Sequence, residues 1–302
     1  MKKTLKKAGF VVLVGRPNVG KSTFLNNLLG EKVSIVSKVP QTTRFSIRCI
    51  LNDKRGQVVF IDTPGILLSK KRLTKFLSNR TFSVKDEADI VLYMVDLSRM
   101  PGSEEKEVLE HLKDMDQPII MVLNKRDLGQ TFADEYIEFW KQNIEGKNDP
   151  LKYFIPISAL EKRGLDEVLD AVFEFLPESP PLYPLNVASD LPEKIMISDI
   201  IREKVFWLAY QELPHSVAVR VDEITHKKNK LMYIQAVILV ERNSQKAIII
   251  GKKGGLLKKI GTAAREELEK SYKKRVFVDL RVKVQSNWQK DMQTLRELGY
   301  IV

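Results

Sequence analysis

Hydrophobic and polar positions along the first part of the chain follow two alternating periods. Short apolar runs rich in β-branched residues predict five buried strands, at residues 10–14, 58–62, 90–96, 119–123 and 153–158. Between these runs, apolar residues recur at helical spacing and predict helices that pack against a core, as with Val108, Leu109, Leu112 and Met115. This alternation predicts an α/β domain over residues 1–176, with a mostly parallel sheet and flanking helices.

The pattern changes after residue 176. Residues 177–192, PESPPLYPLNVASDLP, hold five prolines and predict a stiff interdomain linker. Residues 193–302 then predict a second, α+β domain with the order helix, two strands, two helices, strand and trailing helix. Its leading helix is expected over about 193–211, its second long helix over about 256–270 and its last strand over 276–284.

Composition narrows the class of protein. The 302 residues suffice for two domains, and no apolar run approaches the length needed to span a bilayer. The basic and then apolar N-terminus runs directly into a glycine loop and lacks a cleavage site, so we do not interpret it as a secretory signal. Cys49 is the only cysteine, and the three histidines match no metal-ligand spacing. These features predict a soluble cytoplasmic protein.

Charge is distributed unevenly between the two predicted domains. Residues 1–192 hold 28 Lys and Arg against 26 Asp and Glu, whereas residues 193–302 hold 22 against 13, a net charge of +9. This asymmetry favours a polyanionic partner for the second domain, either nucleic acid or an anionic membrane surface.

A glycine loop, GRPNVGKST, lies between the first predicted strand and a helix. Its spacing matches the P-loop consensus, whose backbone N–H groups and helix N-terminus hold phosphates. Lys21 is expected to reach the β- and γ-phosphates, and Ser22 to coordinate Mg²⁺. The predicted nucleotide contacts in this segment are Gly15, Arg16, Pro17, Asn18, Val19, Gly20, Lys21, Ser22 and Thr23.

Two later segments indicate which base is bound. NKRD at 124–127 offers the Asp127 carboxylate to guanine N1–H and the 2-amino group, a donor pair that adenine lacks. We expect Lys125 to lie across the base and Asn124 to tie this loop to the P-loop. SAL at 158–160 is expected to donate the Ala159 N–H to guanine O6, which adds Ser158, Ala159 and Leu160 to the predicted contacts.

The segments between these motifs have the character of a switch. DTPG at 62–65 ends a predicted strand, with Asp62 placed near Mg²⁺ and the Gly65 N–H near the γ-phosphate. PQTTR at 40–44 has no strong periodicity and holds a threonine that can reach Mg²⁺ while the γ-phosphate is present. The predicted contacts here are Asp62, Thr63, Pro64, Gly65 and Ile66.

GRPNVGKS, QTTR, DTPG, NKRD and SAL resemble, in this order, the five motifs of a translation-factor-related GTPase. The resemblance implies a P-loop GTPase fold, makes Thr43 the Mg²⁺ ligand, and gives Lys21, Thr43 and Gly65 the catalytic roles. Ile66 stands where Ras-type proteins have the glutamine that orients water, so we expect slow intrinsic hydrolysis. Asn18 is shared with relatives that recruit K⁺, which adds K⁺ to the expected cofactors.

A second glycine loop, GKKG at 251–254, lacks P-loop spacing and follows a predicted helix. Its setting resembles a type II KH domain, whose GxxG loop clamps single-stranded RNA. The resemblance implies an apolar floor for the bases, formed by Ile248, Ile249 and Ile250 with the neighbouring strands. The expected RNA contacts are Gly251, Lys252, Lys253, Gly254, Lys258, Lys259, Arg202 and Lys204.

Taken together, the G motifs, the proline-rich segment and IIIGKKGGLLKKIG resemble the Era family of bacterial ribosome-assembly GTPases. That resemblance implies binding of 16S ribosomal RNA near its 3′ end, a role in 30S subunit assembly and rRNA maturation, and peripheral association with the cell membrane. We expect a monomer. Two alternatives stay open: a membrane-associated signalling GTPase that uses its basic half on anionic lipid, and a constitutive RNA-binding protein.

Overall fold

In the computed structural model, the described residues are 6–34, 36, 47–62, 88–113, 115–129, 131–144, 149–209, 217–227 and 231–299. The chain divides into two compact units, one from residues 1–34 and 43–190, the other from residues 35–42 and 191–302. No described helix combines the length and the apolar character that crossing a membrane requires.

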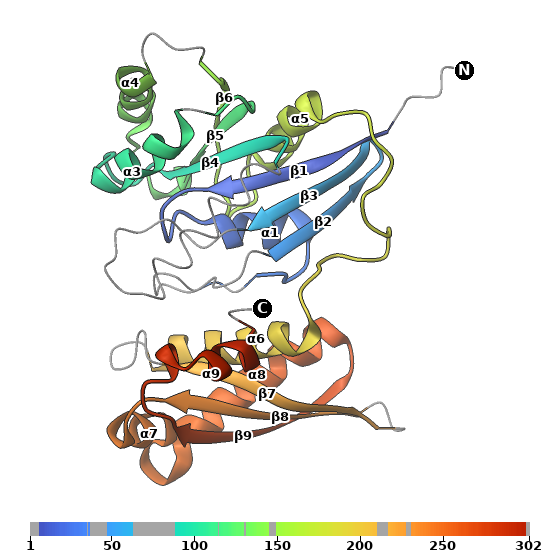
Figure 1. The fold of residues 1–302 in the computed structure, drawn as a ribbon, viewed down its shortest axis with the longest axis vertical. Helices are drawn as coiled ribbons and strands as arrows, with labels where there is room; N and C mark the ends of the chain where they lie inside the picture. The colour runs from blue at the N-terminus through green and yellow to red at the C-terminus, as the bar shows by residue number, and fades with distance from the viewer. Residues whose placement is uncertain are drawn as a thin grey trace. The chain divides into compact units, whose positions relative to one another are not determined.

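The first unit is built on a six-stranded sheet with the order β2-β3-β1-β4-β5-β6 (Figure 1). Every neighbouring pair is parallel except β2 and β3. The five strands predicted from apolar runs all form, and the antiparallel edge strand β2 is additional. The strands are β1 (Lys7–Val14), β2 (Ile47–Asp53), β3 (Gly56–Asp62), β4 (Ile90–Asp96), β5 (Ile119–Asn124) and β6 (Leu151–Pro156).

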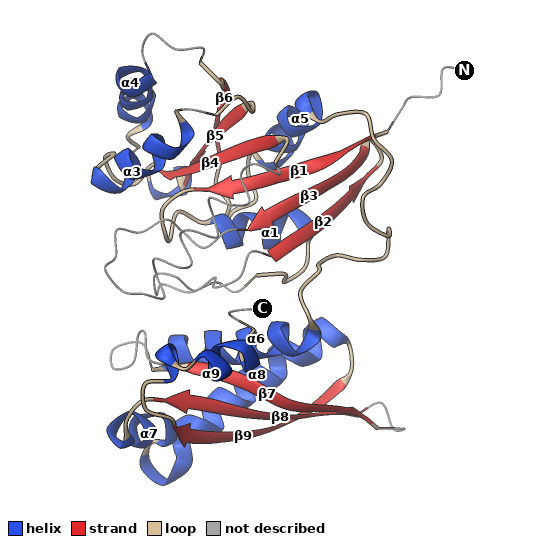
Figure 2. Ribbon diagram, viewed as in Figure 1, coloured by secondary structure: helices blue, strands red, loops and turns tan. Residues whose placement is uncertain are grey.

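Helices flank this sheet, as the periodicity predicted (Figure 2). The apolar stripe of α3 is buried, and Trp140 of α4 joins it in the same core. All seven residues of β4 are buried, as expected for a strand covered on both faces. The helices are α1 (Lys21–Leu29), α3 (Ser103–Leu112), α4 (Ala133–Ile144) and α5 (Leu165–Phe175).

The proline-rich segment pairs with the first unit. The Ile50 N–H donates to the Ala188 carbonyl at 2.8 Å, and the Asp190 N–H donates to the Arg48 carbonyl at 3.1 Å. The buried Gln57 side chain also accepts hydrogen bonds from two N–H groups of the segment. Residues 185–190 therefore run along the edge strand β2 and satisfy part of its hydrogen-bonding capacity, whereas residues 177–179 pair with residues 6–8 at the start of β1.

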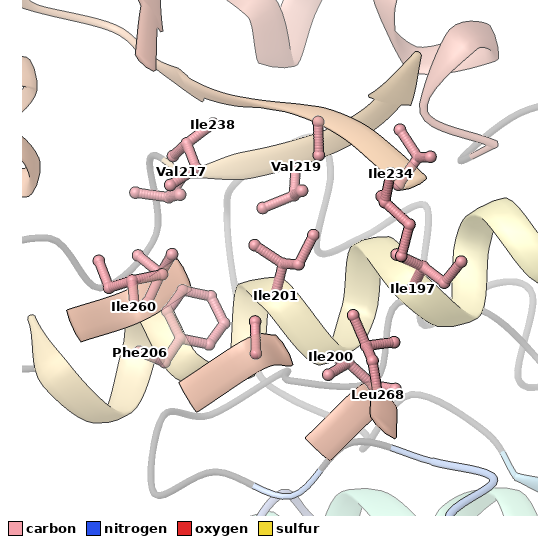
Figure 3. Packing of buried hydrophobic residues seen from close by; sticks show 14 of the residues in the cluster. Ile197, Ile200, Ile201, Phe206, Val217, Val219, Ile234, Ile238, Ile260 and Leu268 are labelled. Atoms are coloured by element: carbon pink, nitrogen blue, oxygen red, sulfur yellow. The ribbon is translucent and has the colours of Figure 1, made fainter. Parts of the chain in front are cut away.

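The second unit has the predicted order of elements and a three-stranded sheet, β7-β8-β9. β7 is antiparallel to β8, and β9 is parallel to it. Ile197, Ile201 and Phe206 of α6 pack against the sheet (Figure 3). The elements are α6 (Glu193–Leu208), β7 (Ala218–His226), β8 (Leu231–Val240), α7 (Asn243–Ile250), α8 (Gly255–Tyr272), β9 (Arg275–Val284) and α9 (Met292–Glu297).

Candidate functional sites

The sequence motifs of the first unit converge at one edge of its sheet. The glycine loop follows β1, Asp62 ends β3, Asn124 ends β5, and Ser158 lies just after β6. Because these four strands are parallel, their carboxyl ends lie at the same edge. β1 lies between β3 and β4, where the strand order changes direction. In open α/β sheets, ligands bind outside the carboxyl ends of the strands at such a point.

The glycine loop wraps around the Lys21 ammonium. Lys21 Nζ donates to the carbonyl oxygens of Gly15 at 2.9 Å and Arg16 at 3.1 Å. Burial lowers the pKa of Lys21 to about 8, although Asp62 acts in the opposite direction. Helix α1 starts at Lys21 with Gly20 as its N-cap and no side-chain cap, so its first N–H groups are available to an anion.

Asn124 connects three loops of this site. Its Nδ2 donates to the Val19 carbonyl at 2.7 Å, and its Oδ1 accepts from the Ala159 N–H at 2.9 Å. Gly20 has φ +105°, and a Cβ there would lie 2.2 Å from Asn124 Nδ2, so only glycine fits. The tie between Asn124 and the P-loop is as predicted, whereas the Ala159 N–H predicted for guanine O6 is bonded to Asn124.

The Asp127 carboxylate is partly exposed beside this tie. Ser158 Oγ donates to Asp127 Oδ1 at 2.5 Å, which joins the loops after β5 and β6. Lys125 has φ +70°, and its Nζ lies 2.6 Å from Asp96 Oδ2. The Leu160 side chain is 71% exposed. This arrangement leaves a carboxylate and a lysine stem at the edge of the loop, where a planar base can be held.

Asp62 is a buried carboxylate surrounded by hydroxyl groups. Ser22 Oγ donates to Asp62 Oδ2 at 3.2 Å, and Ser34 Oγ donates to the same oxygen at 2.8 Å. Among the described residues, Asp62 Oδ1 is buried without a hydrogen-bond partner. Burial raises the pKa of Asp62 against the opposing effects of Lys21 and the two serines. A buried carboxylate oxygen beside hydroxyl oxygens fits Mg²⁺, which prefers oxygen ligands.

Ser34 was not predicted as part of this site. It belongs to no recognised motif, but Asn26 holds it by accepting from the Val33 and Ser34 N–H groups, both at 2.9 Å. The position of Ser34 therefore depends on hydrogen bonds to the side chain of Asn26 in α1. No local pattern in the sequence indicates that contact.

Arg16 contributes to the glycine loop through its backbone. Its side chain is buried and turns toward an acidic cluster, with Nε 2.7 Å from Glu105 Oε1 and an Nη 3.7 Å from Asp96. Glu105 also accepts from the Gly102 N–H and the Tyr136 hydroxyl. Burial is the main cause of the raised pKa of Glu105. The ion pair between Arg16 and Glu105 fixes the glycine loop to α3. Its two members are far apart in the sequence, so no sequence motif indicates it.

Several predicted site residues lie outside the described residues. They are Thr43, Thr63, Pro64, Gly65 and Ile66. Their roles remain predictions, as does the choice of Thr43 over Thr42.

The GKKG loop of the second unit joins α7 to α8. Gly251 has φ +69°, and a Cβ there would lie 2.8 Å from Leu256 Cβ, so the chain turns too tightly for any other residue. Lys252 and Lys253 are exposed in the turn, and Gly254 has φ +76° with open space around its Cα among the described residues. This geometry lets another backbone approach the loop closely.

The surroundings of this loop match the prediction only in part. Lys258 and Lys259 are exposed on α8. Of the three isoleucines expected to form an apolar floor, Ile249 is in the core, whereas Ile248 and Ile250 are half-buried. Ile249 therefore does not contribute to an exposed floor, and the contribution expected from the neighbouring strands stays a prediction.

Arg202 and Lys204 are held by acidic partners inside the second unit. Arg202 is 1% exposed, and its Nη2 lies 2.8 Å from Asp199 Oδ1. Lys204 Nζ lies 2.9 Å from Glu203 and 3.4 Å from Glu267. Because these charges are neutralised within the unit, we withdraw both residues from the predicted RNA surface.

Comparison with known proteins places both units in described families. Residues 10–125 match the family model described as 50S ribosome-binding GTPase, and residues 212–289 match the KH domain. GTPase Era of Geobacter metallireducens is 44% identical over 97% of this chain and 98% of the relative. GTPase Era of Carboxydothermus hydrogenoformans is 42% identical, with the same coverage.

Solved structures agree with the sequence relatives. Aquifex aeolicus Era bound to GDP and aluminium fluoride has a TM-score of 0.90 and 38% identity, covering 98% of this chain and 100% of that one. An Era structure with MgGDPNP and nucleotides 1506–1542 of 16S ribosomal RNA has the same TM-score, identity and coverage. The predicted fold, a P-loop GTPase domain followed by a KH domain, is confirmed, and the chain belongs to the Era family of GTPases.

Proposed function

We propose that this chain binds and hydrolyses GTP in its first unit, and binds 16S ribosomal RNA near its 3′ end through the GKKG loop of its second. The observation that most strongly supports the nucleotide site is that Asn124 holds the P-loop and the loop after β6 together beside Asp127. The Era complex that holds both MgGDPNP and a 16S fragment supports the pairing of the two ligands. The cellular role that follows is 30S subunit assembly and rRNA maturation.

In the nucleotide site, the backbone N–H groups of residues 17–22 would receive the α- and β-phosphates at the N-terminus of α1. Lys21 would exchange the carbonyls of Gly15 and Arg16 for phosphate oxygens, which is an exchange of neutral for charged acceptors. Asp127 would accept from guanine N1–H and the 2-amino group. A contact between the Ala159 N–H and guanine O6 requires that this N–H leave Asn124.

Ser22, Asp62 and Thr43 are the residues that we propose to hold Mg²⁺. Asp62 Oδ1, which has no hydrogen-bond partner among the residues that the structure describes, and the nearby Ser22 hydroxyl support this choice. Mg²⁺ supplies charge neutralisation on the β- and γ-phosphates. We also propose a K⁺ contact at Asn18, whose side chain is exposed in the glycine loop.

Lys21, Thr43 and Gly65 are proposed to stabilise the charge that develops on the γ-phosphate. Ile66 has no group that can orient water, so a backbone group, a cation or a partner must position the nucleophile. We therefore propose that hydrolysis by the isolated protein is slow.

The RNA site is proposed at Gly251–Gly254, with Lys252, Lys253, Lys258 and Lys259 facing the phosphates. The positive φ values and the open approach at Gly254 support close contact with a sugar-phosphate backbone. The exposure of the four lysines supports an electrostatic contribution.

Two binding assays on the full chain test the proposal. Calorimetry with GTP and ATP should show binding of GTP only. Fluorescence anisotropy with single-stranded RNA from the 16S 3′ end should show binding that Lys252→Glu combined with Lys253→Glu abolishes. Equal competition by ATP would contradict the nucleotide site, and unchanged RNA affinity in the double variant would contradict the loop assignment.

We further propose a cytoplasmic monomer that associates peripherally with the cell membrane. The net charge of +9 in residues 193–302 supports attraction to anionic lipid. Flotation with phosphatidylglycerol vesicles, compared with RNA binding at equal ionic strength, tests this. A signalling role on the membrane would gain support if the vesicles bound and the RNA did not.

A further inference from the structure

The β7-β8-β9 sheet has an outer face that its long helices do not cover. Met232, Ile234, Ala236 and Ile238 of β8 point into the core that includes α6 and α8. Side chains alternate along a strand, so the intervening residues of β8 and β9 point to the outer face. The register places them in cross-strand pairs, with Leu231 opposite Arg275, Tyr233 opposite Phe277, and Gln235 opposite Asp279.

One end of this outer face is covered by the C-terminal part of the unit. Ala218 and Leu239, which pair across β7 and β8, are fully buried. Arg220 forms an ion pair with Glu297 of α9 at 2.5 Å, so α9 lies over the sheet here. Buried apolar residues at this end need no further partner.

The other end carries an aromatic pair, half-buried Tyr233 and exposed Phe277. The rings of Tyr233 and Phe277 are stacked, with centroids 5.4 Å apart and planes 5° from parallel. Phe277 is 52% exposed on the edge strand β9. The Tyr233 hydroxyl accepts from Gln235 at 3.3 Å and donates to Asp279 at 3.4 Å, and these bonds orient the ring on which Phe277 stacks.

Basic residues surround this pair. Lys227 Nζ lies 5.2 Å from the centre of the Tyr233 ring. Lys273, Lys274 and Arg275 are exposed in the turn from α8 into β9. We call these four residues with Tyr233 and Phe277 the aromatic-basic end of the sheet.

Acidic residues nearby are already engaged. Asp279 Oδ2 accepts from Arg281 at 3.0 Å, and Glu223 Oε1 accepts from the Thr225 hydroxyl at 2.7 Å. Asp279 is offset by Arg281, whereas Glu223 lies on β7, on the far side of β8 from Asp279 and Phe277. The charge beside Phe277 is therefore positive.

We propose that the aromatic-basic end is a second RNA contact, in which an unpaired base stacks on Phe277 and the four cations meet its phosphates. Stacking on a fixed aromatic ring beside basic side chains is how proteins bind single-stranded nucleic acid without reading sequence. A flat, parallel ring pair suits a base better than it suits lipid chains, which need inserted apolar groups. The inference rests on the proposed RNA binding and adds a site to it.

This contact is remote from GKKG. Strands β8 and β9 run from the aromatic-basic end toward α7, which leads into the loop (Figure 1). Seven residue steps along β8 at about 3.3 Å each separate Tyr233 from Val240 by about 23 Å, and α7 lies between Val240 and the loop. An RNA of about four nucleotides, the length that one KH loop clamps, cannot span both, whereas a longer strand gains from the second contact by avidity.

The test measures anisotropy of the full chain with two RNAs, one of about four nucleotides that binds at GKKG and one several times longer. Phe277→Ala should weaken the longer RNA about 5- to 100-fold, the range seen for loss of one stacked base, and leave the short one unchanged. Phe277→Trp should keep the affinity. Met292→Ala on α9 is the matched control, since Met292 has the same exposed fraction, 52%.

Three outcomes are informative. If Phe277→Ala binds the longer RNA normally while Lys252→Glu with Lys253→Glu abolishes binding, the second contact is wrong and the proposed function stands. If the double variant keeps binding and Phe277→Ala loses it, the GKKG assignment fails and the second contact stands. If Phe277→Ala weakens only phosphatidylglycerol vesicle binding, the face serves a membrane and the RNA contact is overturned.

Discussion

In the proposed nucleotide site, guanine selectivity depends on the single carboxylate of Asp127. Asp127→Asn replaces an acceptor with an amide that repels guanine N1–H but can pair with xanthine. We expect GTP affinity to fall by about 3 kcal/mol, roughly 100-fold, because a charge-assisted hydrogen bond pair is lost. Xanthosine triphosphate should bind better to the variant than to the native chain. Calorimetry measures both, with exposed Asp134→Asn as the control; unchanged preference for GTP would refute the base-recognition argument.

Gly20 and Gly30 both have positive φ. Substitutions at the two positions therefore distinguish the effect of a steric contact from the effect of backbone conformation. An alanine Cβ at Gly20 would meet Asn124 at 2.2 Å, whereas at Gly30 it meets nothing within 4 Å among the described residues. We expect Gly30→Ala to cost about 1 kcal/mol of unfolding free energy from the backbone alone. Gly20→Ala should cost roughly 3 kcal/mol and also disrupt the Asn124 tie.

Urea denaturation and GTP titration check this pair. Gly20→Ala should lose at least about tenfold in GTP affinity, roughly the effect of one neutral hydrogen bond, whereas Gly30→Ala should retain normal affinity. Equal effects of the two substitutions on GTP binding would show that the contact between Gly20 and Asn124 does not control the loop.

Among the elements, the proline-rich segment is held against the first unit in part by the buried side chain of Gln57. Gln57 Oε1 accepts from the Leu182 and Tyr183 N–H groups at 2.8 Å each. Gln57→Ala leaves both donors without this acceptor, so we expect a loss of about 1–3 kcal/mol in unfolding free energy and faster hydrogen exchange at these two amides. Ser179→Ala, which removes an exposed hydroxyl bond, should change stability by less than about 0.5 kcal/mol. Slow exchange in Gln57→Ala would mean that the β2 pairing holds the segment by itself.

Elements that carry their signal locally could be predicted from the sequence. The strand Ile90–Asp96 is apolar throughout because both its faces are buried, and its predicted limits are the observed ones. β2 was not predicted because only part of it is buried and it includes exposed Asn52, which blurs the two-residue period. The pairing of residues 185–190 with β2 could not be predicted locally either, because the prolines give residues 177–192 the composition of a linker.

The burial of Arg202 could not be predicted from the sequence, for a different reason. An arginine on a helix in a basic half of the chain is usually exposed, and its sequence neighbours gave no other indication. In the structure α6 is buried on more than its apolar stripe, and Ser198, Asp199 and Glu203 are buried with Arg202. Charged side chains that are buried on a helix are paired with an opposite charge. Their burial can therefore be recognised only once the position of the partner is known.

For the whole molecule, the structure shows which residues carry the excess positive charge. The excess of positive charge in residues 193–302 does not come from α6, where Arg202 and Lys204 are neutralised. Exposed residues that contribute to it are Lys252 and Lys253 at GKKG, and Lys227, Lys273, Lys274 and Arg275 at the other end of the sheet, whereas α8 has a net charge of only +1. The charge asymmetry could be predicted from composition, but its division between two ends of one sheet required the structure.

Two binding sites in one chain are a switch only if they are energetically coupled. If the GTP-bound state presents the RNA sites better than the GDP-bound state, a GTP analogue should raise RNA affinity by about 5- to 150-fold relative to GDP, the usual range of coupling. Linkage then requires RNA to raise affinity for the analogue, relative to GDP, by the same factor. Anisotropy in each nucleotide state and calorimetry with and without RNA measure the two factors independently.

Agreement of these factors is a stronger test than either alone, because contaminating nucleotide or partial activity distorts them differently. Lys252→Glu with Lys253→Glu should remove the effect of RNA on the nucleotide while leaving GTP affinity itself unchanged, since these side chains are in the second unit. If both factors equal one in the native chain, the first unit does not control RNA binding. The chain would then be a constitutive RNA-binding protein whose GTP site serves another step.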